Sequence, residues 1–134
     1  LRRQRQMCIR DRIWGVWHSP LILLGYNFGR TDITGVLFMI GGCMAWGVLL
    51  GWLRLRSASV WPAVLAHGSL NAAAGLIVIF AASQPDLALA GPLGLAGWIV
   101  AAAVIAVLVV TGQFREQPEL ADGPGRLLSA PRAE

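Results

Sequence analysis

The chain has 134 residues, enough for one domain, and its composition is that of a membrane protein. Hydrophobic residues make up 56% of it and charged residues only 13%, whereas soluble domains carry about 25% charged residues. Residues 1–12 hold five Arg and one Asp, which leaves six Arg and six acidic residues elsewhere, so the net charge of +4 comes from this short stretch alone. No basic patch interleaved with aromatic residues remains to indicate nucleic-acid binding, and two distant cysteines do not support a disulfide framework.

The first twelve residues differ in character from the rest. The string Arg-Gln-Met-Cys-Ile-Arg-Asp-Arg resembles translated sequencing-adapter fragments at the ends of metagenomic reading frames, so we interpret residues 1–12 as a basic N-terminal segment of artefactual origin. The alternative is a native basic segment beside the membrane. The absence of Lys, with many Ala, Gly and Arg, favours a GC-rich bacterial genome.

Four apolar segments follow, over residues 13–28, 33–53, 61–82 and 93–112. The last three have the roughly twenty residues that cross ~30 Å of hydrocarbon. Only helices satisfy the backbone of such segments in lipid. We therefore predict an all-α transmembrane bundle of about four membrane helices over residues 13–112, a multi-pass protein of the inner (plasma) membrane.

Three features refine this topology. Arg54 and Arg56 predict a cytoplasmic loop, which places the loops at Arg30 and Asp86 outside. Residues 113–134 are polar and contain three Pro, so we expect a disordered cytoplasmic tail. Within the first apolar segment, a proline two residues past His18 should kink the helix or free a carbonyl there.

Two histidines, His18 and His67, lie inside these apolar segments. A lone histidine in a membrane is more often a structural hydrogen-bonding group than a catalyst. Counted from the predicted cytoplasmic ends of their helices, however, both lie roughly 7–9 Å deep, and an ionisable group in lipid usually marks a working site. Asn71 is four residues past His67, on the same helix face. We therefore predict one shared site in which an imidazole activates water and an amide stabilises an oxyanion.

The site needs an acid that the sequence does not supply. Three Glu lie in the C-terminal tail, and Asp32 and Asp86 lie in the outer loops, so we expect no carboxylate to reach the histidines. Ser19 and Ser69 are not in a G-x-S-x-G nucleophile elbow. Two His and one Asn are also too few for a catalytic zinc site, so we expect no bound metal.

Two motifs resemble those of a known family, the CAAX protease and bacteriocin-processing (CPBP) family of intramembrane proteases. The stretch Trp14-Gly-Val-Trp-His18 resembles its second motif, aromatic-x-x-x-His. The stretch His67-Gly-Ser-Leu-Asn71, with its lead-in from Gly51, resembles its third motif, His-x-x-x-Asn. Both occur in order, with matching flanks, which makes the resemblance fairly specific.

The resemblance implies an all-helical membrane endopeptidase that cleaves peptide or prenylated-protein substrates near the cytoplasmic face. His18, supported by Trp14, would join a glutamate of a first motif, Glu-Glu-x-x-x-Arg, in activating water, while His67 and Asn71 would stabilise the oxyanion. Zinc is possible in an intact family member. This sequence lacks the Glu-Glu motif, so we expect a truncated chain that is inactive alone. The alternatives are a non-enzymatic membrane protein that binds haem or metal through its paired histidines, and a catalytically dead scaffold of the same family.

Overall fold

The computed structural model describes residues 2–115, with side chains from Ile9 onward. Over that range every regular element is a helix, which confirms the predicted all-α fold. The helices are α1 (Arg2–Trp17), α2 (Ser19–Leu23), α3 (Ile33–Ser57), α4 (Trp61–Phe80), α5 (Leu87–Ala90) and α6 (Leu95–Val110). The predicted tail over residues 116–134 lies outside the described residues.

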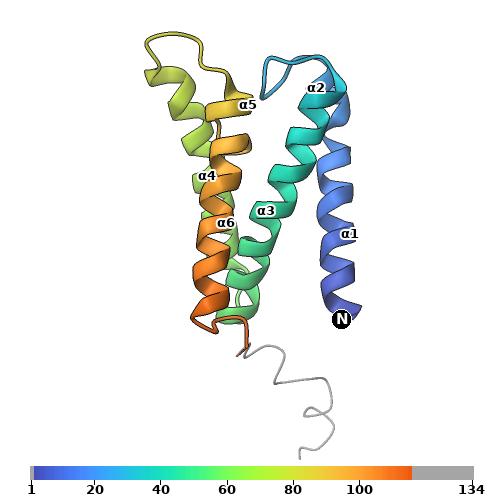
Figure 1. The fold of residues 1–134 in the computed structure, drawn as a ribbon, viewed down its shortest axis with the longest axis vertical. Helices are drawn as coiled ribbons and strands as arrows, with labels where there is room; N and C mark the ends of the chain where they lie inside the picture. The colour runs from blue at the N-terminus through green and yellow to red at the C-terminus, as the bar shows by residue number, and fades with distance from the viewer. Residues whose placement is uncertain (1, 116–134) are drawn as a thin grey trace, which may run out of the picture.

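The helices run up and down, with α3 in contact with α1, α4 and α6 (Figure 1). The start of α1 lies at the same end as the turn from α3 to α4, and α2 lies at the opposite end (Figure 1). Three units, α3, α4 and the stretch Leu87–Val110, are long and apolar enough to cross a membrane. The protein is therefore a membrane protein, and α1 adds an Arg-rich helix to these three.

Helix α3 has a well-defined start and end. The Asp32 side chain accepts a hydrogen bond from the Gly35 N–H at 3.2 Å, which caps the helix start. At the other end Ala58 adopts a left-handed conformation with φ 51°, which ends the helix. Pro62 then occupies the first turn of α4, where its missing N–H costs nothing. These local signals fix the turn that sets α4 antiparallel to α3.

An ion pair joins the two loops at the opposite end of the bundle. Arg30 donates to Asp86 at 3.1 Å, and Asp86 also accepts from the Ala88 N–H at 3.0 Å as the cap of α5. Arg30 is also only two residues from a second acid, Asp32. In the structure Asp32 is engaged as a helix cap, and Arg30 instead bridges to the loop before α5.

The first apolar segment, residues 13–28, is not one continuous helix. Helix α1 ends one residue before His18, whose N–H bonds to the Gly15 carbonyl at 3.2 Å in a tightened turn. Pro20 lies in the first turn of α2, and residues 24–32 form a loop. The predicted kink at this proline is confirmed, whereas the helix begins eleven residues earlier than the apolar pattern indicated.

The buried core lies where α2, α3 and α5 meet. Its side chains come from each of these elements and from the loop before α3: Ile22, Phe28, Val36, Met39, Cys43 and Ala88. Cys43, predicted to be a small packing residue, is only 1% exposed. Burial of these side chains holds the short helices α2 and α5 against the middle of the bundle, because neither is long enough to be stable alone.

Helices α1 and α3 approach closely at Gly15. A Cβ atom on Gly15 would lie 2.7 Å from the Ile40 Cα, which real structures do not tolerate. In contrast, a Cβ atom on Gly75 of α4 would meet no atom within 4 Å among the described residues. The approach of α1 to α3 therefore depends on the missing side chain at Gly15.

We predict that Gly15→Ala lowers the free energy of unfolding by about 1–3 kcal/mol, because α1 must move away from the α3 backbone. Gly75→Ala is the matched control and should be neutral or stabilising by up to about 1 kcal/mol, since alanine favours helix and the site is open. Denaturant unfolding in detergent micelles, followed by circular dichroism, measures both. Equal stability of the two variants would contradict the close contact.

Candidate active site

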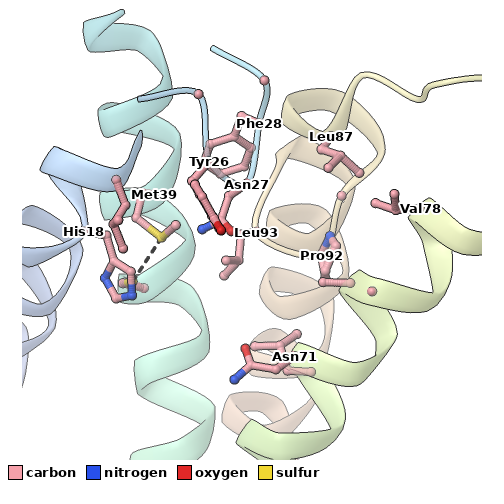
Figure 2. Close-up of a pocket in the computed structure, with 18 of the residues that line it drawn as sticks. His18, Tyr26, Asn27, Phe28, Met39, Asn71, Val78, Leu87, Pro92 and Leu93 are labelled. Atoms are coloured by element: carbon pink, nitrogen blue, oxygen red, sulfur yellow. Dashed lines mark hydrogen bonds between the residues drawn. The ribbon is translucent and has the colours of Figure 1, made fainter. Parts of the chain in front are cut away.

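One cavity of about 750 Å³ contains all three residues predicted to form the site. It lies between α3 and α4, and the loop before α3 and the turn around Pro92 also form part of its wall (Figure 2). His18, His67 and Asn71 all line it. Residues about fifty positions apart in the sequence thus share one cavity, as the two-motif argument predicts.

The tightened turn at the end of α1 orients His18. Its Nδ1 lies 2.8 Å from the Trp14 carbonyl oxygen, the acceptor that the residue-18 N–H would use in a regular helix. A carbonyl only accepts, so Nδ1 carries the proton and donates. The other ring nitrogen, Nε2, then keeps its lone pair and is the basic atom of the ring. The break at His18 therefore supplies both the orientation and the tautomer of this histidine.

The Trp14 indole contacts both histidines. Its ring centroid lies 6.1 Å from that of His18 and 5.3 Å from that of His67, both in edge-on geometry. Trp17 adds a second edge-on contact to His18 at 5.1 Å. Aromatic contacts of this kind fix ring orientation and contribute about 0.5–1.5 kcal/mol each. The predicted supporting residue is therefore the side chain through which the two motifs meet.

The two histidines leave the backbone at different heights in the bundle, although both imidazoles reach the Trp14 indole. The equal depth predicted for them assumed that the first helix starts near residue 13. Helix α1 starts at Arg2, at the end of the bundle that holds the α3–α4 turn. The His18 backbone therefore lies a full helix length, roughly 24 Å, from that end of the bundle (Figure 1). His67 is six residues into α4, roughly 9 Å from the same end. The two rings still line one cavity, because the side chains extend toward each other as far as the Trp14 indole that both contact.

Asn71 projects into the cavity from α4, across from His18 on the α1 side (Figure 2). It lies one helical turn past His67 on the same face of α4, as the spacing predicts. No described residue makes a hydrogen bond to the Asn71 amide. An amide that faces a cavity with free donors is suited to hold negative charge that develops on a substrate oxygen.

Most of the remaining cavity wall is apolar. The apolar side chains come from α3, α4 and the α5 region: Met39, Cys43, Leu70, Val78, Leu87 and Leu93. Cys43 donates a weak hydrogen bond to the Met39 sulfur at 3.7 Å, so the thiol is engaged within α3. The cavity therefore combines a few polar groups with an apolar lining, a combination typical of sites for largely apolar ligands.

Asp11 is a residue that the sequence argument missed. It is only 4% exposed, and a Cβ atom on Gly47 would lie 2.6 Å from its carboxyl carbon. With Trp14 and His67 it lines a second cavity of about 460 Å³. Asp11 thus shares a cavity with His67, while its ion pair is with Arg10, at 3.6 Å, and the expectation that no carboxylate reaches the histidines stays a prediction. Its position on the buried face of α1 depends on the register against Gly47.

The donor set does not fit a metal. No group of three His, Cys, Asp or Glu side chains is placed to hold an ion in the part of the chain that the structure describes. His18 and His67 each pack against the Trp14 indole, which occupies the space beside both rings. A catalytic zinc site needs about three such ligands, so we derive no step through zinc.

Comparison with known families gives one match. Residues 4–73, more than half of the chain, match the family described as type II CAAX prenyl endopeptidase Rce1-like. The chain belongs to this family. The matched range includes Trp14, His18, His67 and Asn71, and it ends two residues after the last of them. The resemblance inferred from the two motifs is therefore confirmed.

No curated protein and no solved structure matches the chain. The family match starts at residue 4, so it takes in most of the basic segment, and α1 is continuous from Arg2 through that segment. The division into residues 1–12, 13–112 and 113–134 stays a prediction.

We predict that Trp14→Ala lowers the free energy of unfolding by about 1–3 kcal/mol, because it removes a large, partly buried side chain that contacts both histidines. Trp61→Ala is the matched control; its ring is 68% exposed, and its loss should change stability by less than about 0.5 kcal/mol. Trp14→Phe should restore part of the loss. Unfolding in detergent micelles tests the series, and equal effects of the two alanine variants would count against the role of Trp14.

Proposed function

We propose that this chain supplies the histidine–asparagine part of the active site of an intramembrane endopeptidase, which hydrolyses a peptide bond in a prenylated or otherwise membrane-associated peptide. The observation that carries the proposal is the single cavity lined by His18, His67 and Asn71 within a chain of the CAAX prenyl endopeptidase family. The apolar cavity wall supports a substrate with a hydrocarbon chain, because such a chain gains about 0.8 kcal/mol per buried methylene.

The chemical roles follow from the free atoms on the cavity wall. The His18 Nε2 lone pair accepts a proton from a water molecule as that water attacks the carbonyl carbon. The carbonyl oxygen gains negative charge in this step, and the Asn71 amide and a protonated nitrogen of His67 donate hydrogen bonds to it. Return of the proton to the leaving amine completes hydrolysis.

The attack by water also needs a carboxylic acid to assist it. In the CAAX protease family that this chain resembles, a Glu-Glu-x-x-x-Arg motif supplies this acid, and this sequence contains no such motif. We propose that the chain binds substrate but needs that motif on a further helix for hydrolysis. Asp11 does not replace it in this mechanism, because the cavity that Asp11 lines is the second one, which His18 does not line.

The location is proposed from charge and from the position of His67. Arg54 and Arg56 lie near the end of α3, beside the connection to α4. His67 lies six residues past the start of α4, so it is close to the same end of the bundle. An excess of Arg marks the cytoplasmic side, so we place the His67 end of the cavity near the cytoplasmic face of a bacterial inner membrane.

The test is cleavage of a fluorogenic prenylated peptide in proteoliposomes. The chain alone should give no cleavage, and the chain fused behind an apolar helix that carries Glu-Glu-x-x-x-Arg should cleave it. In the active fusion, His18→Ala, His67→Ala and Asn71→Ala should each lower kcat at least about 100-fold, since each removes a proton acceptor or an oxyanion donor.

Ser69→Ala is the matched control, because Ser69 lies between His67 and Asn71 on α4 and does not line the cavity. It should retain activity. Full activity of His67→Ala in correctly inserted protein would refute the oxyanion role. A Soret band after addition of haem, lost on replacement of either histidine, would instead support the haem-binding alternative.

A further inference from the structure

The loop that ends the cavity has an unusual backbone. Between α2 and α3, three residues within five adopt positive φ: Gly25 at 89°, Asn27 at 69° and Gly29 at 64°. Glycine adopts this region freely, but Asn27 carries a side chain. Only Asn27 and Ala58 among the described non-glycine residues have positive φ, and Ala58 ends a helix.

Asn27 lies at the centre of a three-residue turn. The Phe28 N–H donates to the Tyr26 carbonyl at 2.8 Å, which is a γ-turn hydrogen bond across Asn27. A γ-turn with positive φ at its centre is rare and strained. Strained residues of this kind persist only where the surrounding structure holds them, and they occur mainly at binding and catalytic sites.

The surroundings of the loop hold this turn in place. Phe28 is 7% exposed and packs against Phe38 of α3, with ring centroids 6.0 Å apart. The Gly29 N–H donates to the Gly25 carbonyl at 3.2 Å. The turn is therefore anchored on the side that faces α3, and Asn27 is held at a fixed place at the end of the cavity.

The Asn27 amide faces the cavity. Asn27 lines it, and its side chain extends below the loop into the space between α3 and the α4–α6 side (Figure 2). No described residue makes a hydrogen bond to this amide. Asn71, whose amide is also free, lines the same cavity from α4. Gln84, in the loop between α4 and α5, is a third carboxamide on the wall, so unpaired amides line the cavity from both loops at this end and from α4.

We propose that Asn27 is a substrate-positioning residue whose side-chain amide pairs with the peptide backbone of the substrate, on the side of the cavity opposite Asn71. This inference rests on the proposed function. A carboxamide offers both a donor and an acceptor, which matches the C=O and N–H of an extended peptide. Pairing with backbone fixes the peptide along the cavity and leaves the choice of side chains to the apolar wall. The competing explanation is that Asn27 is present only because asparagine tolerates positive φ.

Two substitutions separate these explanations. Asn27→Gly removes the amide and keeps, or relieves, the backbone conformation, whereas Asn27→Ala removes the amide and adds strain. Binding of a fluorophore-labelled prenylated tetrapeptide to the chain in detergent micelles measures the effect without any need for cleavage. Asn27→Gly should weaken binding about three- to tenfold with an unchanged or higher thermal midpoint, and Asn27→Ala should lower both affinity and midpoint.

Ser83→Ala, in the neighbouring loop and not among the residues that line the cavity, is the control and should bind as the parent chain does. A set of peptides, each with one backbone amide replaced by an ester, gives the decisive comparison. The parent chain should discriminate against an ester at one position, and Asn27→Gly should not.

The outcomes are distinct. Asn27→Gly that binds with parental affinity, or that retains the parental discrimination at every ester position, overturns the role of Asn27 and leaves the proposed function intact. A parent chain that does not bind the prenylated peptide overturns the proposed substrate class and this inference together. Loss of the ester discrimination in Asn27→Gly supports the inference even if the loop is less stable.

Discussion

The missing N–H of Pro20 is the constraint on which the site depends. A proline two residues past His18 prevents the first helix from continuing, so the chain tightens its last turn and starts the short helix α2. The tightened turn directs the His18 N–H to Gly15 and leaves the Trp14 carbonyl to the His18 ring. One local constraint thereby ends a helix, fixes a tautomer and turns the chain toward the loop that closes the cavity.

The Trp14 indole connects the turn at His18 with helix α4. It contacts His18 on its own side and His67 on α4, so a single rigid side chain couples the two motifs. The close approach of α1 to α3 at Gly15 keeps the indole at this depth, because a larger residue there would push α1 outward. The ring contacts of Trp14 therefore depend on the close approach of α1 to α3. The cavity that both histidines line depends in turn on these ring contacts.

Polar groups in this cavity are few, and each has a specific position. One imidazole has an internal partner and a free nitrogen, and three carboxamides, those of Asn27, Asn71 and Gln84, have no hydrogen-bond partner among the described residues. A peptide attached to a hydrocarbon chain suits a cavity whose wall combines these carboxamides with apolar side chains.

The sequence alone determined the membrane class, three of the helices, the kink at Pro20 and the family, because hydropathy, helix caps and the two short motifs are local signals. It also placed His67 and Asn71 on one face, since a spacing of four residues has that consequence in any helix. Tertiary structure alone decided the true start of α1, the height of His18, the burial of Asp11 against Gly47, the Arg30–Asp86 pair and the strained turn at Asn27. Each of these depends on which faces of distant segments meet, and a pattern of apolar residues does not encode that register.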